Sequence, residues 1–277
     1  MMNRELLRQR AMRQMGWAIA AATAILLFYG FLYFAEPFSD FWNNLLSNLL
    51  NVLSAALSAI VATVIWRQYE VSEPPRRIWG PFAAALWLWT VAEVIWGYFN
   101  MTVGEVNTGL PDVFWVSAYG LFAWALFAQF HLLFRPDPAR ARTRLVWVLA
   151  GVAALTALTV LLLSFFTGEA SDLSAWVNGF YPAGDLAIGL AALALVRAYR
   201  QGALGYPWIG LLVFTAADLL YAWLAMSGAY DWSLENRSFI SAIADLSYLA
   251  AYLTVAVGCF AQLLLLRYGP VFRRKSE

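Results

Sequence analysis

Runs of about 20 apolar residues recur along the chain, and they constrain its fold more than any other feature. They cover Gly16 to Phe34, 41–66, 78–99, 113–134, 145–166, 175–198, 206–228 and 239–267. At about 1.5 Å per residue, a helix of this length crosses the roughly 30 Å apolar core of a bilayer. Charged or Pro- and Gly-containing segments close each run. The sequence therefore predicts an all-α integral membrane protein with eight transmembrane helices and the lipid bilayer as its main partner.

The composition agrees with this fold and excludes several kinds of site. The chain is 62% hydrophobic and 13% charged, whereas soluble domains carry about 25% charged residues. A single histidine, His131, excludes bis-histidine haem, and a single cysteine, Cys259, excludes an intrachain disulfide. The only lysine, Lys275, lies in the tail, which excludes a retinal-type Schiff base inside the membrane. We therefore expect no cofactor, no metal and no nucleic-acid partner.

The basic residues predict the orientation. Of the 18 lysines and arginines, all but Arg237 fall in the tails or in the loops after the even-numbered spans. Short loops that are rich in arginine and lysine stay in the cytoplasm. Both termini are therefore expected in the cytoplasm, and the acidic loops outside.

Two halves of the sequence match one another. Glu93, Asp112 and Gln129 correspond to Asp218, Asp245 and Gln262, and an aromatic residue stands three positions after each acid. Asn44 and Asn51 have the same spacing as Asn178 and Asp185. With an even number of spans per half, such repeats are parallel. The prediction is a tandem 4+4 repeat with a first four-helix unit at 1–135, a cytoplasmic linker at 136–144 and a second unit at 145–277.

The candidate site consists of acids, amides and aromatic residues in the outer half of the predicted bundle. Acids inside a membrane are costly unless they face the bundle interior, so we expect them to face one another. Two interpretations remain open: an outward-facing pocket for a cation, a proton or an amine-bearing ligand, or interhelical hydrogen bonds that serve only stability. For Asp112 a helix cap is an equal explanation. The candidate binding residues are Asn44, Asn51, Glu93, Trp96, Asp112, Asn178, Asp185, Asp218, Tyr221, Asp245, Tyr248 and Tyr252.

Several segments with these acids resemble the multi-helix membrane sensor regions that precede bacterial diguanylate cyclases and sensor histidine kinases. They are Ala-Glu93-Val-Ile-Trp96, Pro-Asp112-Val-Phe-Trp115, Tyr181-Pro182-Ala-Gly-Asp185, Ala-Asp218-Leu-Leu-Tyr221 and Ala-Asp245-Leu-Ser-Tyr248. The resemblance implies a sensory or binding role in the bacterial inner membrane. In that family an output domain follows the last helix, whereas this chain ends at Glu277. The expectation is a stand-alone module that acts through a separate kinase, cyclase or other membrane subunit.

Two other classes of function, a transporter and a hydrolase, are alternatives to a sensory module. A small cation- or proton-coupled transporter, or an accessory subunit of a membrane complex, would use the same acids as coupling sites. An intramembrane hydrolase would need a nucleophile with a base, or a metal-ligand set, and the sequence has neither pattern. We therefore expect no enzymatic activity.

Overall fold

A computed structural model gives the arrangement of the helices. It describes residues 4–104, 108–134, 173–199, 203–227, 229–230 and 238–269, with residues 148, 151–152, 154–159 and 162. The described part is helical, as predicted. The predicted span 145–166 falls largely outside the described residues, and the linker 136–144 falls wholly outside them.

Seven described helices are long and apolar enough to cross a membrane. A short 3-10 turn, η1 (Ala203–Gly205), precedes α7. Within a bilayer only a helix or a closed barrel satisfies the backbone hydrogen bonds, which explains why each apolar run is one continuous helix. The seven are α1 (Arg4–Ala35), α2 (Asp40–Arg67), α3 (Arg76–Thr102), α4 (Leu110–Phe134), α6 (Leu173–Ala198), α7 (Tyr206–Met226) and α8 (Phe239–Tyr268).

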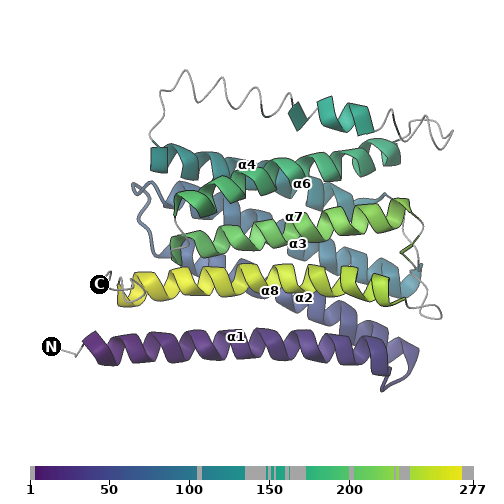
Figure 1. Ribbon diagram of the computed structural model, residues 1–277, viewed down its shortest axis with the longest axis horizontal. Coiled ribbons are helices and arrows are strands. Elements are labelled where there is room, and N and C mark those ends of the chain that lie inside the picture. The colour runs from purple at the N-terminus through teal and green to yellow at the C-terminus, as the bar shows by residue number, and fades with distance from the viewer. Residues whose placement is uncertain are drawn as a thin grey trace.

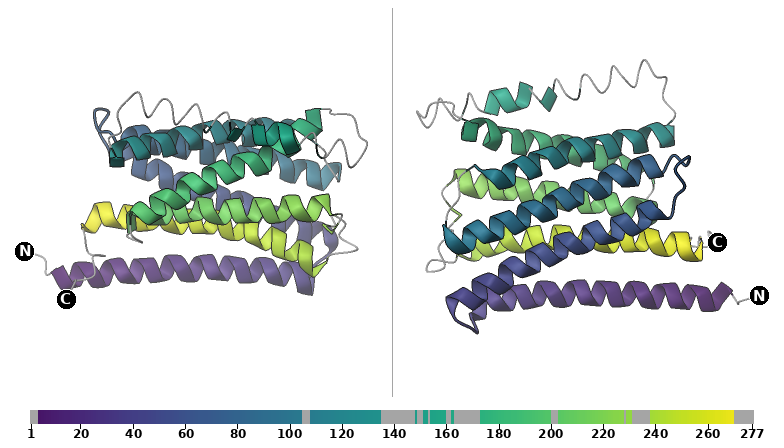
Figure 2. Two further views of the ribbon diagram at one scale, coloured as in Figure 1. Left: turned by 45° about the horizontal axis from the view of Figure 1, so that its top comes forward. Right: turned by 180° about the vertical axis from the view of Figure 1, so that it is seen from behind.

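Six of these helices form a flattened ring. Helices α2, α3 and α4 pack in order in one layer, and α6, α7 and α8 pack in order in the other (Figure 1). The layers meet at two seams, where α4 packs on α6 and α2 packs on α8. Helix α1 lies outside the ring against α8 and α2, as the views in Figure 2 show. The ring encloses a common interior that side chains of both layers fill.

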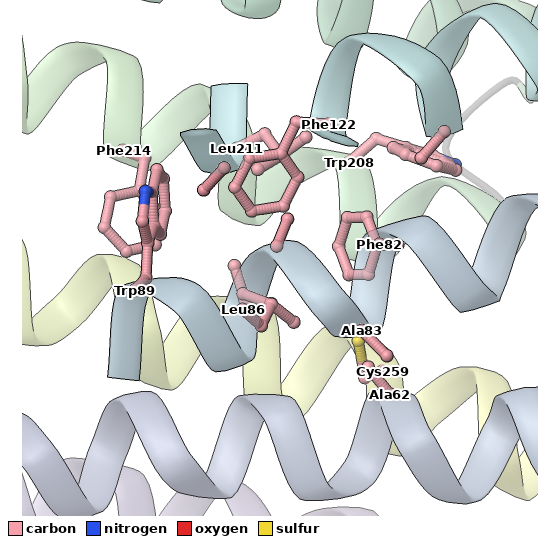
Figure 3. Packing of buried hydrophobic residues seen from close by; sticks show 14 of the residues in the cluster. Ala62, Phe82, Ala83, Leu86, Trp89, Phe122, Trp208, Leu211, Phe214 and Cys259 are labelled. Atoms are coloured by element: carbon pink, nitrogen blue, oxygen red, sulfur yellow. The ribbon is translucent and has the colours of Figure 1, made fainter. Parts of the chain in front are cut away.

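Aromatic side chains occupy the middle of that interior (Figure 3). The Trp89 ring of α3 lies 4.4 Å from the Phe214 ring of α7 and 4.7 Å from the Phe122 ring of α4, centroid to centroid. Phe82 contacts both Phe122 and Trp208 at 5.5 Å. Large buried rings with edge-to-face contacts make a dense, continuous core.

Glycines allow neighbouring helices to approach closely. A Cβ atom on Gly258 of α8 would lie 2.6 Å from the carbonyl oxygen of Tyr206, and one on Gly210 of α7 would lie 2.4 Å from Val255. Lipid provides no hydrophobic driving force between helices, so their association depends on the close packing that small residues allow. This close packing fixes how α7 and α8 are rotated, and α8 carries two of the candidate tyrosines.

The two ends of the ring differ in charge. Within the six ring helices every arginine lies at a helix end, and the chain direction brings these ends together. We call this end the basic end; α1 starts and α8 finishes there (Figure 1). Its ring residues are Arg67, Arg76, Arg77, Arg197 and Arg267.

Candidate functional site

Each acid of the candidate site has a tyrosine beside it. Tyr252 of α8 donates its hydroxyl to Glu93 of α3 at 2.7 Å, and Tyr119 of α4 donates to Asp185 of α6. In α7, Asp218 lies within interaction distance of Tyr248 of α8. Hydrogen bonds to a carboxylate are among the stronger ones in proteins. The phenols therefore satisfy acids that would otherwise be unpaired in an apolar bundle.

The three deep acids lie together. Asp218 is next to Asp185 and also near Glu93, so α3, α6 and α7 contribute one carboxyl group each. Both layers of the ring take part. Because the sequence places no lysine or arginine in the middle of any ring helix, these helices bring no positive charge to balance the acids.

Two further acids lie nearer the end opposite the basic end. Tyr181 donates to Asp112 at 2.6 Å, and Tyr230, which follows α7, donates to Asp245 at 2.8 Å. The second oxygen of Asp112 accepts the Gly109 N–H at 2.7 Å. Asp112 therefore caps α4 from within its first turn, and is not the N-cap residue that the sequence suggested. Burial, followed by the adjacent Asp245, raises the pKa of Tyr230, which keeps this hydroxyl protonated as a donor.

Ring contacts join these pairs into one network. Tyr221 lies 5.0 Å from Tyr230 and 5.9 Å from Tyr248, and Tyr119 lies 6.0 Å from Tyr181, between ring centroids. The acids, bonded tyrosines and Tyr221 thus continue from Asp245 through Asp218 and Asp185 to Asp112. We call them the acid–tyrosine network. Its members are Glu93, Asp112, Tyr119, Tyr181, Asp185, Asp218, Tyr221, Tyr230, Asp245, Tyr248 and Tyr252.

The position of Tyr119 depends on a glycine. A Cβ atom on Gly184 would lie 2.9 Å from two carbons of the Tyr119 ring. The glycine therefore lets this ring pack closely against α6, where its hydroxyl reaches the neighbouring Asp185. Thr215 of α7 donates to the Asp185 carbonyl at 3.0 Å, and this bond ties α7 to the same turn of α6.

Tryptophans close the network on two sides. The Trp89 ring lies 6.1 Å from Tyr252 and 6.3 Å from Tyr119, and its indole N–H is buried without a hydrogen-bond partner among the described residues. Trp115 lies against the Tyr252 hydroxyl, and the rings of Trp96 and Trp115 are 6.1 Å apart. Trp89 therefore packs against the network from the middle of the bundle, and Trp115, with Trp96 beside it, lies next to Tyr252.

The predicted amides do not join the acids in the same way. Asn44 belongs to a separate cluster in which Asn48 bonds both Asn44 and Asn100 at 3.0 Å, between α2 and α3. The Oδ1 atom of Asn51 is buried and has no hydrogen-bond partner in the described part of the chain. The side chain of Asn178 is exposed.

Five residues that belong to the network or contact it were absent from the predicted set: Tyr119, Tyr181, Tyr230, Trp89 and Trp115. For Tyr119 a signal exists, because it stands seven residues after Asp112, as Tyr252 stands after Asp245. Tyr181 stands four residues before Asp185, one helical turn away. Nothing in the local sequence distinguishes Trp89 from the tryptophans that face lipid.

The arrangement suits a positively charged or hydrogen-bond-donating ligand. Among the described residues, no group of three histidine, cysteine or acidic side chains has the spacing to hold a metal ion. Carboxyl groups next to aromatic faces attract organic cations. No family model, curated protein or solved structure matches this chain.

Proposed function

We propose that the protein is a membrane-embedded binding module that takes a small cation or amine from the side opposite the basic end. One observation carries the proposal: Asp185 and Asp218 lie next to one another with Glu93 near Asp218, although the three acids come from three helices and both layers. If ionised, such groups repel one another unless a positive charge lies among them. A bound cation or proton would remove that repulsion.

The positions of the acids along their helices support entry from that side. The Asp185 side chain is buried, and those of Glu93 and Asp218 are half-buried. Asp112 and Asp245 lie closer to the same end: Asp112 is in the first turn of α4, and Asp245 is six residues after the start of α8. A cation would therefore pass two outer acids before it reaches the three deep ones.

We further propose a parallel repeat in which α2, α3 and α4 correspond to α6, α7 and α8. Trp89 and Phe214, which have equivalent places in the matched segments, contact one another at 4.4 Å across the ring. Contact between equivalent residues is expected next to a two-fold axis. Gln129 and Gln262, another equivalent pair, both lie buried near the basic end.

The proposed orientation has the basic end and both termini in the cytoplasm of a bacterial inner membrane, since arginine-rich segments stay inside. The site then opens to the periplasm. By analogy with the sensor regions that the sequence resembles, we propose that ligand binding alters the packing of the two layers. A separate kinase, cyclase or other subunit would detect the altered packing at the basic end.

Thermal unfolding of the purified protein tests the binding proposal. Methylammonium, tetramethylammonium and sodium serve as probes. We expect at least one of them to raise the melting temperature of the native protein. Asp218→Asn should abolish that increase and still fold, because an amide replaces a carboxyl as hydrogen-bond partner. Asp40→Asn, at the exposed start of α2, is the matched control and should keep the full increase.

Two other results would favour the interpretation that the acids have only a structural role. If no probe stabilises the native protein, or if Asp218→Asn behaves like Asp40→Asn while Asp218→Leu unfolds, the acids serve only as interhelical hydrogen bonds.

A further inference from the structure

A second polar cluster lies near the basic end. The Nε2 atom of Gln129 in α4 donates to the hydroxyl of Tyr199, which follows α6. Gln262 of α8 lies against Tyr69, which follows α2, and Tyr69 in turn lies near Tyr199. We call these four residues the basic-end cluster. None belongs to the acid–tyrosine network.

The two glutamines of the cluster are buried, its two tyrosines are half-buried, and none of the four side chains carries a formal charge. Gln129 is 7% exposed and Gln262 is 4% exposed. Burial raises the pKa of Tyr69, and burial followed by Tyr69 raises that of Tyr199, so both phenols stay protonated. The Oε1 atom of Gln262 has no hydrogen-bond partner within the described residues. A buried amide oxygen without a donor is unfavourable, so a ligand that donates a hydrogen bond is expected to be favoured there.

The aromatic core separates the two polar clusters. On one side Trp89 contacts the tyrosines of the acid–tyrosine network. On the other side Phe82 and Trp208 extend toward the basic end (Figure 3). Along the ring interior, the acid–tyrosine network is therefore followed by the aromatic core and then by the amides and phenols of the basic-end cluster.

The basic-end cluster also spans the two seams of the ring. Gln129 and Tyr199 face each other across the seam of α4 and α6, and Gln262 and Tyr69 across the seam of α8 and α2. Each pair thus joins one layer to the other. Separating the layers at this end would break both contacts and expose the interior to the basic side.

From these observations we propose that the basic-end cluster is a second, weaker site for the same cation and the gate through which it leaves. The protein would then be a carrier, and this inference rests on the cation site proposed above. Neutral amide and phenol oxygens can accept hydrogen bonds from an ammonium group without a full opposite charge. The affinity of such a site is high enough for the cation to enter it and low enough for the cation to leave it.

The native cysteine reports on this gate without any ligand. Cys259 is fully buried beside Ala62 of α2 and Ala83 of α3 (Figure 3), and it stands one turn before Gln262. A membrane-impermeant thiol reagent that is added from the basic side reaches it only when the seam of α2 and α8 opens. The reaction rate therefore measures gate opening.

The experiment compares the rate of Cys259 modification in oriented membrane vesicles. We expect Tyr69→Phe and Gln262→Leu each to increase the rate from the basic side by about fivefold, as loss of roughly 1 kcal/mol of interhelical hydrogen bonding predicts. The rate from the opposite side should not change. Tyr98→Phe and Gln68→Leu, at exposed positions, are matched controls and should react like the native protein.

Equal rates in Tyr69→Phe and in its control would overturn the gate, and so would a rise of the same size from both sides, which indicates general loosening. Because Tyr69→Phe keeps the ring, it remains informative if Gln262→Leu does not fold. Failure of the cation site would appear instead in the melting experiment with Asp218→Asn, which does not involve Cys259.

Discussion

The Tyr252 hydroxyl of α8 donates to the Glu93 carboxyl of α3 over 2.7 Å, although 159 residues separate the two positions. These helices belong to different layers, and α2 is the neighbour that they share in the ring. The bond therefore joins the layers through the interior rather than along a seam. Its removal should weaken the contact between the layers.

Tyr252→Phe tests that bond with the ring retained. We expect destabilisation of about 0.6 kcal/mol, the average for interhelical hydrogen bonds in membranes, and at most about 1.7 kcal/mol, measured by unfolding in mixed micelles. Tyr98→Phe, on the exposed side of α3, should have no effect. A double-mutant cycle with Glu93→Leu, which removes the acceptor, isolates the pair; a coupling energy of zero would show that the bond does not join the layers.

Gly184→Ala should disturb the acid–tyrosine network. Its new Cβ would lie 2.9 Å from the Tyr119 ring, so the ring must move and its hydroxyl withdraws from Asp185. Overpacking of this kind costs about 1–3 kcal/mol. In Gly120→Ala, on the exposed face of α4, the added methyl has nothing within 4 Å and should be neutral or stabilising. Thermal melting compares the two, and equal melting temperatures would contradict the role given to Gly184.

Gly258→Ala should be the more damaging of the two helix-contact substitutions. The nearest atom is the Tyr206 carbonyl oxygen at 2.6 Å, and a backbone atom cannot turn aside as a side chain can. Helices α7 and α8 must therefore separate, and we expect a lower melting temperature than for Gly184→Ala. Gly16→Ala, with open space around it in α1, is the control. The prediction is wrong if Gly258→Ala has the same melting temperature as Gly16→Ala.

Reporter fusions test the proposed orientation. Alkaline phosphatase is active only outside the cytoplasm, so a fusion after Gly104, beyond α3, should be active, and one after Gly269, beyond α8, should be inactive. A fluorescent protein should give the reverse pattern. Phosphatase activity after Gly269 would contradict the orientation inferred from the arginines.

The sequence by itself determined the helices. Apolar runs such as 78–99 and 239–267 appear as α3 and α8, whose ends differ from the prediction by a few residues, because lipid leaves the backbone no alternative to a helix. Helix α1 begins earlier than predicted, at Arg4, because arginine, glutamine and methionine continue a helix well beyond the apolar core. The acids were likewise identified, since a charged residue in an apolar run is visible without any structure.

Only the tertiary structure decided which residues meet. The rotation of each helix and the partner across the ring depend on close contacts such as Gly184 with Tyr119 and Gly258 with Tyr206, which no local pattern contains. Asn178 has the same spacing to Asp185 as Asn44 has to Asn51, yet its side chain is exposed, because burial depends on whether a neighbouring helix covers that level. Tyr69 and Tyr199 lie just beyond their helices, where a sequence suggests only loops. They reach Gln262 and Gln129 because the ring brings helix ends from both halves together.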